Sequence, residues 1–122
     1  MEPSDTALLE QWRTERDARA FREIALRHSG MVYNVCRRLL GNRTDAQDVT
    51  QECFLALAQG GGEVRTSLPG WLHTVAVRQS LNRLRGEQRR MERDRQYARS
   101  AAHDAAEDWD DISRHVDDAI AE

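Results

Sequence analysis

The side chains with the most reactive chemistry in this sequence are four histidines and two cysteines, and their spacing does not form a reactive site. The histidines are scattered without the spacing of metal ligands, at His28, His73, His103 and His115. Cys36 and Cys53 form no Cys-x-x-Cys pair, and in a reducing compartment they are expected to be small buried core residues. The sequence has no nucleophile elbow and no glycine-rich phosphate loop. We therefore expect no catalytic residue, no metal and no cofactor.

A row of acidic and polar side chains between residues 44 and 58 is more informative, because it is typical of a binding surface. At about 100° per residue, these side chains fall on the helix face opposite Val49, Cys53 and Leu57. The members of this row are Asp45, Asp48, Gln51, Glu52 and Leu55. An exposed leucine among carboxylates suits a protein interface, with the leucine as anchor and the charges setting orientation. The alternative is an ordinary solvated helix face.

A second row is basic and lies further along the chain. All 18 basic residues are arginine, and residues 65–99 carry nine of them against three acidic residues, although the whole chain has a net charge of −3. At helical spacing, one stripe contains Trp71, Arg78, Asn82, Arg85, Arg89 and Arg93. Guanidinium groups in a row can follow phosphates, and an asparagine among them can hydrogen-bond a base edge. This charge block predicts a polyanion as partner.

The segment before this stripe, residues 60–67, is glycine-rich and contains Arg65, Thr66 and Ser67. A loop of this kind can admit an unstacked base and hydrogen-bond its edge. His73, in the first turns of the basic segment, completes the predicted nucleic-acid-binding set. A solvated face is again the alternative for the stripe, and core packing is the alternative for Trp71.

Helical periodicity predicts the elements that position these rows. Residues 6–13 are expected to form a helix capped by Asp5, and residues 18–40 a helix capped by Asp17, stopped by Gly41 and open to a kink at 29–30. A helix over 44–59 is expected to begin with Thr44 as N-cap and Gln47 completing a capping box. Ser67 is expected to cap the basic helix, which fades over 89–95. The sequence contains no strand-like alternation, so it predicts an all-α bundle.

The carboxy-terminal part of the sequence predicts a different kind of segment. Residues 98–107 are expected to be a linker, followed by a short helix over 109–120 with Asp108 as its cap. We therefore divide the chain into a domain at 1–98 and an acidic linker region at 99–122. No apolar run reaches the roughly 18–20 residues that span a bilayer, and the polar amino terminus is not a secretory signal, so a cytoplasmic location without membrane contact is expected.

The run Gly-Asn-Arg-Thr-Asp-Ala-Gln-Asp-Val-Thr-Gln-Glu-Cys-Phe at 41–54 resembles the region-two signature of bacterial RNA polymerase sigma factors. Its common form in that family is Gly-Asp-x-x-Asp-Ala-Glu-Asp-Leu-x-Gln-Glu-x-Phe. The start of the basic helix, Trp71-Leu72-x-x-Val75-Ala76, is similar to the promoter-reading part of the same domain. The resemblance covers roughly residues 17–90 and is closest to the small extracytoplasmic-function (ECF) type.

The resemblance implies a helical bundle of the region 2 type and a transcription initiation factor, not an enzyme. It implies that Asp48, Gln51, Glu52 and Leu55, with Asp45 beside them, dock on the clamp helices of the largest subunit of core RNA polymerase. It also implies that residues 60–67 and the basic helix bind the non-template strand of the promoter minus-ten element, with one base flipped into a pocket and melting spreading from there.

The sequence departs from the family pattern at several points. Arg78 stands where many relatives have asparagine, Asn82 where many have aspartate, and residues 60–67 lack the aromatic residue often found there. The second domain (region 4), which reads the minus-thirty-five element, is absent. Residues 108–122 are expected to be the linker and first turns leading into it, so the chain is expected to be one domain of a longer protein or a truncated form. Two alternatives remain: an interaction module bound by an anti-sigma factor, and an unrelated helical nucleic-acid-binding protein.

Overall fold

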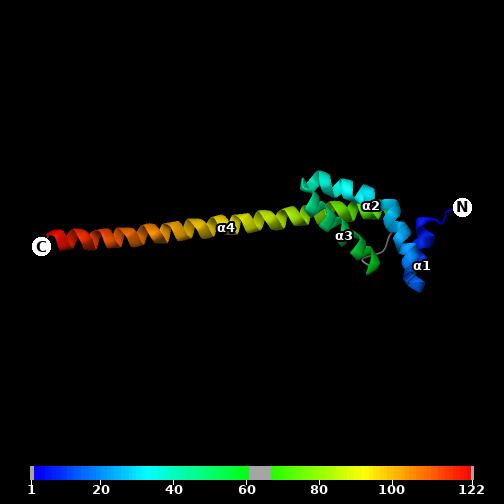
Figure 1. The fold of residues 1–122 in the computed structure, drawn as a ribbon, viewed down its shortest axis with the longest axis horizontal. Coiled ribbons are helices and arrows are strands. Elements are labelled where there is room, and N and C mark those ends of the chain that lie inside the picture. The colour runs from blue at the N-terminus through cyan, green and yellow to red at the C-terminus, as the bar shows by residue number, and fades with distance from the viewer. Residues whose placement is uncertain (1, 61–66, 122) are drawn as a thin grey trace. The chain divides into compact units, whose positions relative to one another are not determined.

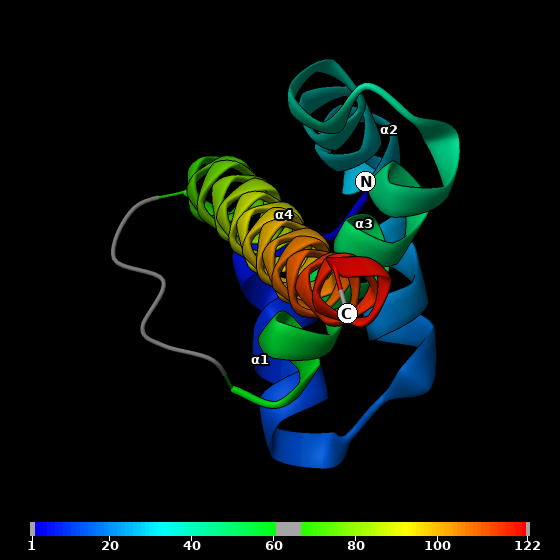
Figure 2. The same cartoon turned by 90° about the vertical axis from the view of Figure 1, so that its left-hand side faces the viewer.

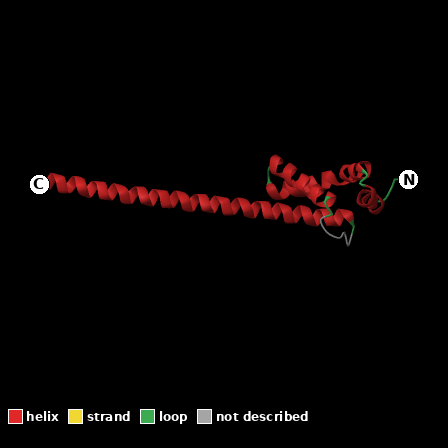
Figure 3. Ribbon diagram, turned by 90° about the horizontal axis from the view of Figure 1, so that it is seen from below, coloured by secondary structure: helices red, strands yellow, loops and turns green. Residues whose placement is uncertain are grey.

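Four helices make up the part of the chain that the structure describes. The computed structural model describes the backbone of residues 2–60 and 67–121 and most of their side chains. The helices are α1 (Asp5–Glu15), α2 (Ala18–Leu40), α3 (Arg43–Ala58) and α4 (Leu68–Ala121) (Figure 1). No strand occurs within the described residues (Figure 3), which confirms the all-α prediction. None of the helices in the described ranges is long and apolar enough to cross a membrane.

The chain divides into two units, Met1–Leu84 and Arg85–Glu122, and each is described by itself. The first unit contains α1, α2, α3 and the beginning of α4. The second unit contains the rest of α4. The boundary at residue 98 that the sequence suggested stays a prediction.

Three of the predicted helix ends are confirmed by the structure. The Asp17 carboxylate accepts hydrogen bonds from the backbone N–H groups of Arg19 and Ala20, at 3.0 and 3.4 Å. Gly41 ends α2 in the left-handed conformation, with φ 77°, which glycine adopts without steric cost. Between these ends α2 stays helical through residues 29–30. Ser67 Oγ accepts a hydrogen bond of 3.2 Å from the N–H of Gly70 and caps α4.

Three other predicted N-caps are wrong. Asp108 lies inside α4, and at Asp5 and Thr44 a residue slightly earlier in the chain does the capping. Ser4 caps α1 by accepting a hydrogen bond of 3.1 Å from Ala7 N, whereas Asp5 is the first helical residue. Asn42 caps α3 in place of Thr44, and its Oδ1 accepts a hydrogen bond of 2.9 Å from Asp45 N. The Asn42 Nδ2 group also donates to Asp45 Oδ2 at 2.8 Å, so cap and first turn bind each other reciprocally.

Residues 98–107 are helical and not an irregular linker, and the short helix expected over 109–120 is part of α4. The reason is local. After Gly86 the sequence contains no glycine or proline and is rich in alanine and arginine, which favour helix without needing burial. Side-chain pairs at helical spacing add to this preference: an ion pair between Arg95 and Glu92 at 3.8 Å and a contact between His103 Nε2 and Glu107 Oε1 at 2.9 Å.

The core of the first unit is built from one face of each helix. The apolar side of α3 predicted from periodicity is confirmed, because Val49, Cys53 and Leu57 are buried, and Ala46 is buried with them. The other buried apolar side chains come from α1, α2 and the start of α4: Leu8, Leu9, Ala20, Ile24, Val32, Cys36, Leu68, Leu72, Val75 and Ala76. α3 is thus held with one side against the core and the other side turned away from it.

α1 fixes the carboxy-terminal end of α3. The Trp12 indole Nε1 and the Arg16 guanidinium both donate hydrogen bonds to the backbone oxygen of Ala58, each at 3.1 Å. The Trp12 ring also contacts the Phe21 ring, with centroids 4.9 Å apart. The end of α3 lies beside α1 (Figure 1 and Figure 2). A carbonyl left unpaired by the helix end is therefore bound by side chains from a distant part of the sequence.

The two cysteines are buried in the core, as predicted, and are not joined by a disulfide. Burial raises the pKa of the Cys53 thiol from 9.0 to about 12, and the neighbouring Cys36 and Glu52 add to the shift. The thiolate is the reactive form of cysteine, so the native Cys53 side chain is inert at neutral pH.

Ser80 is the one buried polar side chain among the core residues of the described chain. It is fully buried, and its Oγ has no hydrogen-bond partner. We predict that Ser80→Ala raises the free energy of unfolding by about 1–2 kcal/mol, because it removes a buried hydroxyl and improves helix propensity. Urea unfolding measures the change. Asn34→Ala, on the exposed side of α2, is the control, since it gains only the propensity term of about 0.5 kcal/mol. An equal effect of the two substitutions would contradict the burial argument.

Cys53 leads to a prediction about stability at high pH. A thiol whose pKa is raised by folding contributes stability that is present below its unfolded pKa and is lost as pH rises toward its folded pKa. Between about pH 9 and pH 11 the unfolded state therefore releases a proton that the folded state keeps. We expect the free energy of unfolding to fall by up to about 1.4 kcal/mol per pH unit from this group.

The measurement is a series of urea titrations across this pH range with wild type and Cys53→Ala. The alanine variant is expected to be less stable throughout, because it leaves a cavity, but to have a shallower pH slope. Identical slopes would show that Cys53 is not the titrating group.

Candidate functional site

The acidic row predicted on α3 is mostly exposed. Asp48, Gln51 and Glu52 are exposed, and Leu55 is 56% exposed although it is a large apolar residue. Because Val49, Cys53 and Leu57 pack into the core on the opposite side, the rotation of α3 about its own axis is fixed. These four side chains, Asp48, Gln51, Glu52 and Leu55, form the surface that we call the α3 face.

Asp45 differs from the rest of the predicted row. Its side chain is only 20% exposed, and both carboxylate oxygens accept hydrogen bonds. Asn42 Nδ2 binds one oxygen at 2.8 Å, and Arg83 Nη2 binds the other at 3.0 Å. Asp45 therefore lies at the edge of the α3 face as part of an internal network, and it is less available to a partner than the sequence suggested.

Arg83 is a residue that sequence reasoning missed. It lies on α4, outside the predicted arginine stripe, and its guanidinium reaches three carboxylates of α3: Asp45 at 3.0 Å, Asp48 at 3.5 Å and Glu52 at 3.7 Å. Partial burial disfavours the charged guanidinium, but the three carboxylates outweigh it and raise the pKa of Arg83. The only signal in the sequence was its charge, because the contact depends on how α3 and α4 pack.

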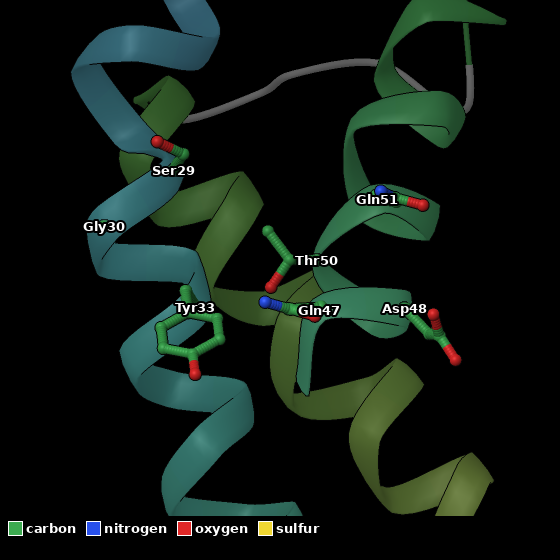
Figure 4. A pocket seen from close by; sticks show the side chains of 7 residues that line it. All are labelled: Ser29, Gly30, Tyr33, Gln47, Asp48, Thr50 and Gln51. Carbon is green, nitrogen blue, oxygen red and sulfur yellow. The ribbon is translucent and has the colours of Figure 1, made fainter. Parts of the chain in front are cut away.

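Two adjoining grooves run between α2 and α3 beside the α3 face. One has a volume of about 480 Å³ and a largely apolar lining, with Phe21 and Ala25 from α2 facing Phe54 and Leu55 from α3. The other has a volume of about 590 Å³ and a mixed polar and apolar lining that includes Tyr33, Gln47 and Asp48. Figure 4 shows the side chains of Gln47 and Thr50 directed from α3 toward α2, with Asp48 directed the other way.

The groove residues on α2 were not predicted as part of any site. A possible signal was the Ser29-Gly30 pair, because small side chains in the middle of an amphipathic helix leave room beside a neighbouring helix. In the structure Ser29 lines both grooves, and a Cβ added at Gly30 would meet no atom within 4 Å.

The predicted nucleic-acid residues of the first unit have different environments. His73, Arg78 and Asn82 are exposed on α4, and Ser67 is exposed at its N-cap. Trp71 is half-buried and packs against the hydrophobic core, which favours the core-packing reading for most of its ring. Within this unit the structure thus places Arg78 and Asn82, one helical turn apart, where a partner can reach them.

The remaining predicted nucleic-acid residues lie elsewhere. Arg85 and Arg89 belong to the second unit, where both are exposed and Arg89 Nε donates to the backbone oxygen of Arg85 at 3.4 Å. Arg65 and Thr66 lie outside the described residues. Among the described side chains, no group of three or more histidines, cysteines, aspartates or glutamates is placed to hold a metal ion.

Comparison with known proteins connects these surfaces to a family. Residues 24–90 match the model of the Sigma-70 region 2 family. The ECF RNA polymerase sigma factor SigE of Mycolicibacterium smegmatis is 30% identical over 85 residues, which cover 69% of this chain and 33% of that protein. SigW of Bacillus subtilis, also an ECF RNA polymerase sigma factor, is 28% identical over 71 residues, covering 57% of this chain and 38% of SigW.

A third relative, the ECF RNA polymerase sigma factor SigM of Mycobacterium tuberculosis, is 31% identical over 71 residues, which cover 57% of this chain and 36% of SigM. The chain thus spans about a third of the length of these relatives. No solved structure matches the chain. The matched segment begins in α2, includes all of α3 and extends into α4, so it contains the α3 face and the exposed arginines Arg78 and Arg89. With its motif, its helical fold and its relatives in agreement, the chain belongs to the Sigma-70 region 2 family.

Proposed function

We propose that this chain is a transcription initiation factor domain that binds core RNA polymerase and the promoter minus-ten element. Its role is binding, and it carries out no reaction of its own. The names of its relatives describe RNA polymerase sigma factors, which favours the same pair of partners here. The observation that carries the proposal is the two-sided character of α3, whose one side is core and whose other side presents carboxylates and an exposed leucine.

The polymerase partner is assigned to the α3 face. Leu55 can serve as an apolar anchor. A single exposed leucine destabilises the free domain little, and its burial by a partner adds to the binding free energy. Asp48 and Glu52, half-exposed at 51% and 50% of their side chains, can orient a basic surface. We propose that this face docks on the clamp helices of the largest polymerase subunit, with Asp45 at its edge, bound to Asn42 and Arg83.

The DNA partner is assigned to α4 and the segment before it. Arg78 in the first unit, and Arg85 and Arg89 in the second, are arginines that can contact phosphates, and Asn82 can hydrogen-bond a base edge. The remaining members of the proposed set are Arg65, Thr66, Ser67, Trp71 and His73. Flipping a base costs a few kcal/mol of stacking, which phosphate contacts and a pocket for the base must offset.

An anti-sigma factor is a second candidate partner. The apolar groove between α2 and α3, lined by Phe21, Phe54 and Leu55, can accept the apolar side of a helix. This groove shares Leu55 with the α3 face, so a protein bound there would block the proposed docking on polymerase. The family match removes the alternative of an unrelated nucleic-acid-binding protein.

Charge reversal on the α3 face tests the docking role. We predict that the double substitution Asp48→Lys with Glu52→Lys weakens binding to core polymerase by at least about tenfold, because it replaces attraction by repulsion at a charged interface. Binding to single-stranded minus-ten DNA should persist. Fluorescence anisotropy of the labelled chain, titrated with core polymerase and separately with the oligonucleotide, measures both.

The matched control is Glu10→Lys with Glu15→Lys on the exposed side of α1, which changes the net charge of the chain by the same amount. Circular dichroism checks that both variants stay folded. If the α3 variant and the α1 control bind polymerase equally well, the docking assignment is wrong.

Arg78 tests the DNA role separately. We expect Arg78→Gln to weaken binding of single-stranded minus-ten DNA and to reduce the slope of log affinity against log salt by about 0.7, the value for one lost phosphate contact. Arg13→Gln, an exposed arginine on α1, is the control with the same charge change. The salt slope is the decisive quantity, and a slope that is the same in both variants would remove Arg78 from the proposed DNA contacts.

A further inference from the structure

Arg83 belongs to α4, yet its guanidinium is bound to the carboxylates of α3. Its contacts to the three α3 carboxylates differ in length. The bond to Asp45 is short, at 3.0 Å, whereas the contacts to Asp48 and Glu52 are longer, at 3.5 and 3.7 Å. Two of the three carboxylates, those of Asp48 and Glu52, are the ones proposed above to meet the polymerase.

Asp45 is the anchor of this network. Its second oxygen is held by Asn42, the N-cap of α3, and its side chain is far less exposed than those of Asp48 and Glu52. Arg83 can therefore keep its shortest bond while its two longer contacts are lost. The contacts to Asp48 and Glu52 are long and partly exposed to solvent, so each is weak by itself.

The charge of Arg83 also acts on any approaching partner. A guanidinium beside three carboxylates reduces the negative potential of the α3 face and repels basic side chains. A basic partner that pairs with Asp48 and Glu52 must take them from Arg83. This exchange lowers the affinity for the partner. It does not unfold the domain, because the contact between Arg83 and Asp45 stays.

We propose that Arg83 is an internal competitor of the polymerase for Asp48 and Glu52, and that it weakens docking in the free chain. This inference rests on the proposed function and adds a regulatory contact to the same face. When the partner's basic side chains bind Asp48 and Glu52, Arg83 gives up these two contacts and keeps its bond to Asp45. The competition changes affinity by a factor and does not switch docking on or off, since the contacts that are lost are weak.

The test compares wild type with Arg83→Gln in the 122-residue chain, titrated with core polymerase at low and high salt. Arg83→Gln is expected to bind about three- to tenfold more tightly at about 0.05 M salt. The gain should shrink at about 0.5 M salt, where partly exposed charges are screened. Arg13→Gln on α1, with the same charge change, should leave the affinity close to that of wild type.

Three results overturn or separate the claims. Equal or weaker binding of Arg83→Gln, with wild type binding normally, overturns the competitor role and leaves the docking proposal in place. Absence of polymerase binding by wild type overturns both. An equal gain for Arg13→Gln shows a general charge effect and also overturns the competitor role.

A second variant covers the case in which Arg83→Gln does not fold, as judged by circular dichroism. Arg83→Lys keeps the charge but loses the planar fork that reaches several carboxylates at once. It should bind polymerase more tightly than wild type, by a smaller factor. Unchanged or weaker binding by this variant overturns the proposal.

Discussion

The burial of Val49, Cys53 and Leu57 on one side of α3 is the constraint on which the rest of the site depends. These residues recur at intervals of four, so together they fix the rotation of the helix about its axis. Once that rotation is fixed, Asp48, Glu52 and Leu55 have to face away from the core. The reciprocal cap at Asn42 and the side chains of Trp12 and Arg16 on the Ala58 carbonyl hold the two ends of the same helix. The α3 face is therefore a rigid surface, and little order has to be created when a partner binds it.

The negative potential of the α3 face cannot be judged from the number of acidic residues on α3 alone. Asp45, Asp48 and Glu52 look like three equivalent carboxylates in the sequence, but packing against α4 brings one guanidinium to all three at unequal distances. Asp45 becomes largely structural, whereas Asp48 and Glu52 stay half-exposed. Because arginine has a planar fork of donors, a single side chain can serve several carboxylates, which a lysine does less well. The exclusive use of arginine in this chain makes such shared contacts more available.

The helix ends were predictable from the sequence where only one nearby residue was well suited to cap the helix. Asp17, Gly41 and Ser67 were identified correctly because each is a good cap with no equally good neighbour on its outer side. Asp5 and Thr44 were wrong because Ser4 and Asn42, just before them, are at least as good. The helical structure of residues 98–107 was not predicted, because these residues have little apolar surface to bury and their alanine content favours helix without it. The role of Arg83 could not be found, since it depends on how α4 packs against α3, and the α2 side of the grooves was missed because the Ser29-Gly30 pair was considered only as a kink.

The two positions at which α4 departs from the family pattern both change the charge of its exposed surface. By the resemblance to the family pattern, Arg78 stands where many relatives have an uncharged residue and Asn82 where many have an acidic one, so each makes this part of α4 more positive by one charge. Both side chains are exposed, so the change reaches the surface and is not absorbed in the core. Additional positive charge strengthens phosphate binding, which is independent of sequence, and makes affinity more dependent on salt. Under the proposed function, we infer that a domain with these two residues draws more of its DNA affinity from the backbone, and that its selectivity among promoters comes from the few contacts that reach a base edge.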